Sequence, residues 1–543
     1  MSASTSSHWN HEVRLLAWLA VCVSVFSFLF YLRRGDVLLY GDAIAHINIA
    51  RRVFDSKTPG LLQLGTVWLP LPHLLMMPFL ISDEMWRRGV GGSIPSMAAY
   101  VCGVVGMFRL VRGALAGNGK ATGSARVAAW TAALVYGANP NLIYMQTTAM
   151  GEAVYLAFFI WAVVYFSEFV RGDANALTKC GLCLMAACLT RYDGWFLAGA
   201  MVVGAVVVSP HFYRGRTNGA PRLPTLSSRT AITKFALLAA AGPALWLAYN
   251  AAIYRNPLEF ANGPYSAKAI ERKTATVNPA KGNLYAAGSY FLKSAELNVV
   301  QQPWLGRLWL ALAVTGGVAI WLQAADAWPL LFLWLPLPFY ALSVAYGGVP
   351  IFVPTWWPFS QYNVRYGLEL LPAFAAGLAA LVGLALKSYR QRDRLRMGAA
   401  LAVLGVVVAG YGSIWQSDPI CYREAAVNMR RHLSLDQQLA NWLKALPPDS
   451  TLLMYLGEHV GAVQQAGIPL KRVINEGNHR VWKQPFDPDG LWERALANPP
   501  EFADYVVAFE GDTVWQATRE RQLNELVEIK VTGQPRAVLY RAR

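Results

Sequence analysis

Residues 40–75, "YGDAIAHINIARRVFDSKTPGLLQLGTVWLPLPHLL", directly follow the first apolar stretch of the chain. This segment carries too many charges to cross a bilayer, yet it is too apolar for an ordinary linker. "AIAHINIARRVF" places apolar residues at helical spacing, which predicts an amphipathic helix on the membrane surface from Asp42 to about Asp55. "WLPLPHLLMMPFLI" predicts a second surface helix, with Pro70 and Pro72 near its start.

The composition is that of a polytopic membrane protein. The chain has 543 residues, of which 55% are hydrophobic and only 15% are charged, which excludes a disordered chain. The formal net charge is +16. Because the basic residues are spread between apolar stretches instead of gathered on one domain, they do not indicate a nucleic-acid partner. An anionic lipid substrate and membrane topology explain them better.

The apolar stretches predict about eleven membrane spans. The first lacks a small-residue cleavage site behind it, so we interpret it as a retained helix and not as a removed signal peptide. The expected spans are 15–32, 94–111, 127–144, 152–170, 175–190, 194–209, 232–253, 304–323, 326–346, 364–386 and 397–415.

The Lys and Arg residues predict the orientation. The short loops 111–126, 171–179, 210–234 and 387–396 together hold fifteen Lys or Arg residues against two acidic ones, whereas 139–151 and 347–363 hold none. The positive-inside rule therefore places the N-terminus in the cytoplasm and, for an odd number of spans, the C-terminus outside. Arg33 and Arg34 oppose this pattern, but the long loop that they begin counts for less.

The tail, residues 416–543, differs from the rest of the chain. "STLLMYLG", "KRVIN", "ADYVVAFE" and "AVLYRA" predict short strands. "SLDQQLANWLKAL" and "GLWERALAN" predict helices, the first opening on Ser434 with Asp436 in its first turn. Alternating strands and helices predict a small α/β domain. "GEHVGA" is not a dinucleotide fingerprint, so the tail is not expected to bind a nucleotide.

Asp42 and His46 are the polar residues of the first surface helix that could carry chemistry. An Asp at the start of a helix can simply cap free N–H groups or meet the positive end of the helix dipole. His46 lies four residues further on, hence on the same face. A single interfacial histidine is more often structural than functional, so the residues alone leave both interpretations open.

The order of these features resembles the GT-C superfamily of polytopic glycosyltransferases, which includes protein O-mannosyltransferases and lipid A aminoarabinose transferases. "TTAMGEAVYLAFFIWAVVYF" looks like a motif that opens a middle span in bacterial members. "LTRYDGWFLAG" looks like their short hairpin, and "YNVRYGLELLPAFAAG" looks like their late junction between outer loop and helix. Many members have two adjacent acidic residues in the first loop, whereas here Gly41 and Ala43 flank Asp42. Assistance by a divalent metal is therefore left open.

The resemblance implies a sugar donor carried on polyprenyl phosphate and a lipid, glycan or protein acceptor. Asp42 would be the general base of an inverting transfer, because a lipid phosphate leaves readily and the acceptor hydroxyl must lose a proton. Arg365 would bind the donor phosphate. Interfacial snorkelling of Arg365, an ion pair between Arg191 and Asp193, and helix electrostatics at Glu152 are the structural alternatives. The expected substrate-binding residues are His46, Arg51, Glu152, Arg191, Asp193, Tyr362 and Arg365.

We therefore expect a membrane all-α GT-C-type catalytic domain over 1–415, with 33–93 as its first extracytoplasmic loop, and an extracytoplasmic α/β domain over 416–543. The protein would be integral to the bacterial inner membrane, in contact with membrane lipids, with the active site in the periplasm. Two other functions remain open, a transporter or flippase of a lipid-linked saccharide and a noncatalytic assembly subunit. Ionisable residues clustered in outer loops and not in mid-span argue against transport.

Overall fold

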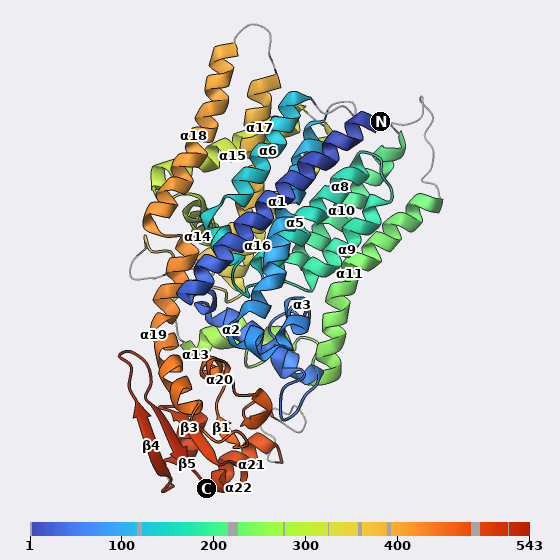
Figure 1. Ribbon diagram of the computed structural model, residues 1–543. Coiled ribbons are helices and arrows are strands. Elements are labelled where there is room, and N and C mark those ends of the chain that lie inside the picture. Colours follow the sequence, from blue (N-terminus) through green and yellow to red (C-terminus); the bar gives the residue numbers. More distant parts are fainter. Residues whose placement is uncertain are drawn as a thin grey trace.

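A bundle of helices occupies most of the molecule, and a small sheet lies at one end of it (Figure 1). The computed structural model describes residues 3–116, 122–214, 226–274, 277–323, 325–356, 361–387, 393–478, 489–519 and 521–543.

Eight described segments are long and apolar enough to cross a membrane, which confirms the expectation of a polytopic helical membrane protein. They coincide with eight of the eleven predicted spans. Their helices are α1 (Ala3–Arg34), α5 (Val90–Leu115), α8 (Glu152–Val170), α11 (Leu226–Tyr254), α15 (Pro303–Gln323), η3 (Ala325–Trp334) with α16 (Pro336–Tyr346), η4 (Val364–Leu370) with α17 (Leu371–Lys387), and α18 (Asp393–Ser417).

The other three predicted spans coincide with helices that are not among these eight, so the count of eleven remains a prediction. They are α6 (Gly123–Gly137) with α7 (Pro140–Met145), α9 (Ala176–Cys188) and α10 (Asp193–Arg214). The predicted span 127–144 is interrupted because Asn139 caps a new helix there. Its side chain accepts from the backbone N–H of Leu142, and Pro140 occupies the first turn.

The first loop contains both predicted surface helices. They are α2 (Gly41–Arg52) and α3 (Leu71–Leu80), followed by the short helix α4 (Asp83–Arg87). The helix α2 ends three residues before the predicted boundary. It packs closely on α5, because a Cβ atom at Gly92 would lie 2.6 Å from a side-chain carbon of Ile47. The glycine therefore sets how near the surface helix lies to the bundle.

The segment between α11 and α15 holds helices that the sequence analysis did not predict, α12 (Glu259–Asn262), α13 (Ala267–Thr274) and α14 (Leu284–Val299). The last of these lies against η4. A Cβ atom at Gly367 would come within 2.4 Å of the backbone nitrogen of Ala295, so only glycine permits this approach. The helix α14 thus fixes the segment that carries Arg365.

The tail begins with a long helix, α19 (Ile420–Leu443), which continues toward the sheet. The predicted helix start at Ser434 is wrong. The turn before it, with Met429, Arg430 and Arg431, is already helical, so the Ser-x-Asp pattern lies inside the helix and caps nothing.

The four predicted strands of the tail are confirmed, and the structure adds a fifth. The sheet order is β2-β1-β3-β5-β4; β1 is parallel to β2 and β3, whereas β5 is antiparallel to β3 and β4. The strands are β1 (Leu452–Met454), β2 (Val473–Ile474), β3 (Tyr505–Phe509), β4 (Asn524–Ile529) and β5 (Ala537–Arg541). The remaining tail elements are α20 (Val460–Ala466), η5 (Leu470–Arg472), α21 (Leu491–Ala497), α22 (Pro499–Phe502) and α23 (Thr513–Thr518).

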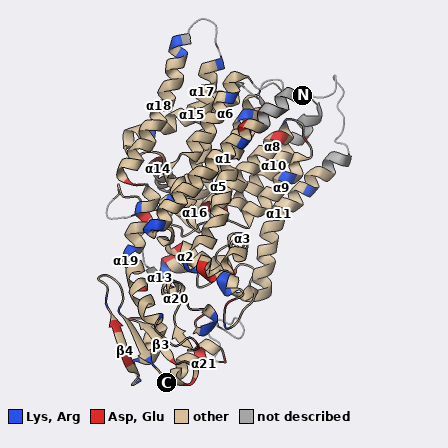
Figure 2. Ribbon diagram, in the orientation of Figure 1, with Lys and Arg blue, Asp and Glu red and all other residues tan. Residues whose placement is uncertain are grey.

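The first loop and the tail lie at the same end of the bundle, and the N-terminus lies at the other end (Figure 1). The two parts are joined by buried hydrogen bonds. The amide of Asn48 donates to the side-chain oxygen of Gln464 over 2.7 Å, and the carboxylate of Asp55 accepts from the backbone N–H groups of Leu470 and Lys471. Figure 2 shows Lys and Arg at the ends of α17 and α18 that face away from the sheet.

Candidate functional site

Asp42 lies in the first turn of α2, where the sequence analysis placed it. Tyr40 is the N-cap residue of that helix, and its side chain makes no capping hydrogen bond. The carboxylate of Asp42 accepts instead from Nη2 of Arg365 over 2.7 Å. The side chain of Asp42 is 42% exposed, whereas that of Arg365 is 8% exposed. The carboxylate of Asp42 is therefore accessible to solvent and is bound by a buried cation.

Arg365, in η4, binds three carboxylates from distant parts of the chain. Its Nη2 contacts Asp42, its Nε donates to Oε1 of Glu152 over 3.1 Å, and its Nη1 donates to Oε1 of Glu424 over 2.9 Å. The other oxygen of Glu424 accepts from the backbone N–H of Val364, which anchors the start of η4. Charge-assisted bonds of this kind are stronger than neutral ones and fix the plane of the guanidinium group.

Arg191 forms the second half of the same cluster. Its guanidinium group contacts Oε1 of Glu152 over 3.3 Å, Oδ2 of Asp193 over 3.1 Å and Oε1 of Glu369 over 3.2 Å. Its Nη2 also donates to the hydroxyl of Tyr340 over 2.6 Å. Oε1 of Glu152 therefore accepts from both arginines and joins the two halves.

One aromatic ring contacts both guanidinium groups. The ring centroid of Tyr366 lies 5.0 Å from the guanidinium carbon of Arg365 and 4.9 Å from that of Arg191. Contacts at this distance stabilise a cation over a ring face, especially where water is excluded. We call the two arginines, the five carboxylates that they bind and Tyr366 the arginine cluster. The five carboxylates are those of Asp42, Glu152, Asp193, Glu369 and Glu424.

The arginine cluster has more carboxylates than cations. Four of the five carboxylate side chains are at most 3% exposed, and Asp42 is the exception. A buried carboxylate without compensation is unfavourable. Oε2 of Glu152 and Oε2 of Glu369 have no hydrogen-bond partner within the described chain. The other oxygen of each residue is bound by arginine: Oε1 of Glu152 by both Arg365 and Arg191, and Oε1 of Glu369 by Arg191.

His46 lies one turn after Asp42, and it is paired with a histidine that the sequence analysis did not select. Its Nδ1 lies 2.8 Å from Nε2 of His73, on α3. Both imidazoles are buried, and burial lowers the pKa of His46 and, more strongly, that of His73. Both are therefore neutral at pH 7. The ring of Trp68 lies 4.8 Å from that of His46.

Arg51 lies outside the arginine cluster and joins α2 to the next two helices. Its guanidinium group pairs with Asp55 over 2.8 Å and with Asp83 over 2.5 Å, and it donates to the carbonyl of Leu80 over 2.6 Å. It also lies 4.9 Å from the ring of Trp86. These contacts join α2 to α3 and α4, and the other oxygen of Asp55 accepts from the backbone N–H of Lys471.

Tyr362 lies just before η4, in an extended bridge with Phe352. It is 46% exposed and lies within electrostatic reach of Asp42 and Arg365. Tyr362 is one of the expected substrate-binding residues, and it lies near the arginine cluster. Residues 357–360, in the aromatic segment before it, lie outside the described residues.

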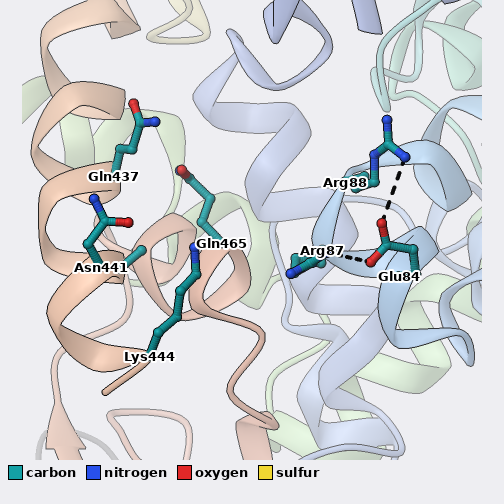
Figure 3. Close-up of a pocket in the computed structure, with 8 residues that line it drawn as sticks. Glu84, Arg87, Arg88, Gln437, Asn441, Lys444 and Gln465 are labelled. Carbon is teal, nitrogen blue, oxygen red and sulfur yellow. Dashed lines mark hydrogen bonds and ion pairs between the residues drawn. The ribbon is translucent and has the colours of Figure 1, made fainter. Parts of the chain in front are cut away.

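A cleft of about 380 Å³ lies elsewhere, between α4 and the facing helices α19 and α20 (Figure 3). Glu84 pairs there with Arg87 and Arg88, opposite Lys444 and Gln465. None of its lining residues belongs to the arginine cluster. We therefore locate the candidate site at Asp42 and not in this cleft.

Five of the expected site residues come together in the structure: Asp42, Glu152, Arg191, Asp193 and Arg365. Glu424, Glu369 and Tyr366 complete the arginine cluster and were not predicted. A signal existed for Glu369, because the quoted motif "YNVRYGLELLPAFAAG" contains an acidic residue one helical turn after Arg365. Nothing in the sequence around Glu424 distinguishes it from other acidic residues of an amphipathic helix.

Comparisons with known proteins identify the fold. No protein-family model matches the sequence, and no curated protein matches it either. Two crystal structures of ArnT from Cupriavidus metallidurans are similar over almost the entire chain. The form bound to undecaprenyl phosphate is 13% identical with a TM-score of 0.58, and 98% of each chain is covered. The apo form is 14% identical with a TM-score of 0.56, covering 99% of this chain and 98% of that one.

A crystal structure of the oligosaccharyltransferase of Archaeoglobus fulgidus is more distantly similar, with 11% identity and a TM-score of 0.47. It covers 92% of this chain and 69% of that chain. At these identities the likeness to ArnT establishes the fold. The chain therefore has the same fold as ArnT, the GT-C fold.

Proposed function

We propose that this protein is an integral membrane glycosyltransferase that moves a hexose-like sugar from a polyprenyl-phosphate donor to an acceptor hydroxyl, with inversion. The observation that carries the proposal is the accessible carboxylate of Asp42, held by the buried Arg365 at the start of a surface helix. Undecaprenyl phosphate bound to ArnT, which has a similar fold, supports a lipid-phosphate donor.

In the proposed reaction Asp42 acts as the general base. The acceptor hydroxyl gives its proton to a carboxylate oxygen of Asp42, and the hydroxyl oxygen forms a bond to the anomeric carbon. The bond between that carbon and the phosphate oxygen breaks, and its electron pair leaves with the lipid phosphate. A single displacement of this kind inverts the anomeric centre. Little acid catalysis is needed because phosphate is already a good leaving group.

The geometry favours a positioning role for Arg365. All three of its guanidinium nitrogens donate to carboxylates, so a donor phosphate would bind only by displacing one of them. We therefore assign Arg365 to the orientation of Asp42, and contact with the phosphate remains a prediction. Arg191 and Glu152 hold Arg365 in place from the bundle side, whereas His46 and Tyr362 are the residues near Asp42 that could contact substrate.

Asp42→Asn tests the mechanism. Asn keeps the shape and caps a helix about as well as Asp, but it cannot take the proton. We expect folding and donor binding to persist while transfer from a polyprenyl-phosphate sugar falls by roughly 10²–10⁴-fold. The assay uses the purified variant in detergent with a competent acceptor.

Glu84→Gln is the matched control, since it removes an exposed carboxylate of the same loop outside the cluster. It should transfer at the wild-type rate. Wild-type turnover by Asp42→Asn would eliminate Asp42 as the base. If the wild-type protein and Asp42→Asn moved a lipid-linked sugar across liposome membranes equally well, the transporter alternative would be supported. If the wild-type protein transferred no sugar to an acceptor, the alternative of a noncatalytic assembly subunit would be supported.

The proposal also sets the orientation of the protein. We infer that the first loop and the tail face the periplasm, because the loops with excess Lys and Arg belong to the opposite side. Single cysteines placed in the tail at Asp449 and in the segment 393–396 test this. A membrane-impermeant thiol reagent applied to intact cells, with the outer membrane permeabilised, should label the first and not the second. The reverse pattern would overturn the orientation and the periplasmic location of Asp42.

A further inference from the structure

Three metal-ligating side chains come together at the joint between α19 and α20. His432 and Asp436 are four residues apart on α19, which places them on one face of the helix. His459 directly precedes α20. Oδ2 of Asp436 lies 3.6 Å from Nε2 of His432, and its Oδ1 lies 3.4 Å from Nδ1 of His459. One ligand atom from each residue lies within 4.8 Å of the other two.

Asp436 needs a positive charge that its surroundings do not supply. The residue is fully buried, and its Oδ2 has no hydrogen-bond partner in the part of the chain that the structure describes. Among the described residues, no Lys or Arg forms an ion pair with it; its partners at ion-pair distance are His432 and His459. A buried carboxylate in this situation is unfavourable unless a proton or a metal ion compensates it.

We propose that His432, Asp436 and His459 bind one zinc ion. In a tetrahedral zinc site with bonds of about 2.0–2.1 Å, neighbouring ligand atoms are about 3.3–3.5 Å apart, and the two contacts of Asp436 are close to this separation. Zinc is commonly bound by imidazole and carboxylate groups such as these. Hard cations such as magnesium prefer oxygen ligands. The i, i+4 spacing on a helix is a usual arrangement for two ligands of one ion.

Binding requires a small rearrangement of one ring. The two imidazoles are stacked, with centroids 4.5 Å apart and an angle of 10° between their planes, so one ion cannot lie in both planes as they stand. Nε2 of His432 lies 2.7 Å from the carbonyl oxygen of Glu458. If the His432 ring rotates, its Nε2 can leave the carbonyl oxygen of Glu458 and bind the metal instead. Its side chain is 14% exposed, which gives water and zinc access, and water completes the coordination.

The zinc ion would be structural. It joins α19 to α20, and both helices pack on the first loop. A Cβ atom at Gly461 would lie 3.6 Å from Ile44, and one at Gly41 would lie 3.1 Å from the sulfur of Met429. The ion therefore supports the surface helix that carries Asp42 without touching substrate.

The experiment uses full-length protein in detergent, without a polyhistidine tag, after treatment with a chelator. Zinc is titrated by calorimetry, and bound metal is measured after gel filtration. We expect one zinc per chain in the wild-type protein. Asp436→Asn and His432→Ala should each weaken binding by at least roughly 100-fold, because loss of a direct ligand exceeds the effect of losing a supporting residue.

Two controls separate this site from other zinc binding. Asp42→Asn should retain full zinc binding, which distinguishes the ion from a metal at the proposed active site. His11→Ala, an exposed histidine on α1, should retain it as well. If the wild-type protein and Asp436→Asn bound zinc equally, the zinc would be an adventitious ion only and the proposal would be overturned. The proposal would also be overturned if Asp42→Asn lost zinc while Asp436→Asn retained it.

Thermal unfolding gives a second readout if a variant folds poorly. Zinc should raise the Tm of the chelator-treated wild-type protein and of Asp42→Asn, because a ligand that binds only the folded state stabilises it. The Tm of His432→Ala should not respond. Cobalt should replace zinc and give the visible absorption of a tetrahedral ion. A zinc response in His432→Ala equal to that of the wild-type protein would contradict the site.

Discussion

The arginine cluster and the histidine group of the tail compensate buried carboxylates in opposite ways. In the arginine cluster each guanidinium group contacts three carboxylates. The compensating cations are therefore side chains of the protein itself. In the tail, Asp436 lies between two histidines and has no described arginine or lysine partner. The two arginines keep their positive charge at every pH of interest. The second arrangement needs a proton or a metal ion from solution.

This difference indicates different tasks. A fixed cation holds Asp42 in one orientation, which is what the proposed role of Asp42 as a general base requires. An exchangeable cation suits a joint that is completed after the chain has folded. The comparison predicts that the stability contributed by the intact tail group depends on zinc in the solution, whereas the stability contributed by the arginine cluster does not.

The largest expected effect is that of Arg365→Ala. The change leaves Glu424 buried without its cation and removes one of the two arginines that Glu152 binds. Breaking a buried ion pair from one side costs about 3–5 kcal/mol. We expect a large fall in Tm in detergent, and neither zinc nor a shift of pH within the neutral range should restore it. Arg307→Ala, which removes an exposed arginine of α15, is the control and should change little.

Arg365→Lys should lower the free energy of unfolding less than Arg365→Ala does. Lysine keeps the charge but not the planar group that reaches three carboxylates, so a loss on the order of 1–3 kcal/mol is expected from donors and acceptors left unpaired. The Tm should fall between those of the wild-type protein and Arg365→Ala. If the alanine variant unfolded like the wild-type protein, the carboxylates would not depend on this cation and the comparison would fail.

A smaller effect is expected from the His46 and His73 pair, whose imidazoles lie within hydrogen-bond distance of each other. Burial lowers the pKa of both below 6.5 in the folded chain. As the pH falls below about 6.5, the unfolded chain therefore takes up protons that the folded chain does not. The contribution of these histidines to the free energy of unfolding is fully present above that pH. Below it, the free energy of unfolding decreases by at most about 1.4 kcal/mol per pH unit for each histidine.

Thermal unfolding between about pH 7.5 and about pH 5.5 checks this expectation. The wild-type Tm should decrease toward the acidic end, and His73→Gln, which removes one titrating group, should show a shallower decrease. An identical pH dependence in the two proteins would show that His73 does not remain neutral on folding.

The sequence predicted those parts of the site whose signals are local. Asp42 follows the first span at the start of a surface helix, and Arg365 begins a span after an apolar loop, so both could be found by position alone. Glu424 could not, because its role depends on a contact with Arg365 that spans 59 residues. His73 is similar: it lies within a segment that we quoted, but only the packing of α3 on α2 reveals its partner.

The fold was predicted where hydrophobicity or strand pattern is strong, and missed where tertiary contacts decide. The helix α14 has no apolar stretch long enough for a span, and its place is set by the close approach of Gly367. The strand β4 is largely exposed and carries Asn524, Glu525 and Glu528, so its composition does not resemble a strand. It forms because β5 offers a free edge with which to pair.

The helix α19 has a mechanical consequence. It carries Glu424, which binds Arg365, and twelve residues later Asp436, which faces the tail; the two lie about 18 Å apart along one unbroken rod at 1.5 Å per residue. A rod of this kind transmits torque. An acceptor that pulled or twisted the tail would move Glu424 relative to Arg365, which also binds Asp42. Under the proposed function, a mechanical load on the tail would therefore reach the carboxylate of Asp42.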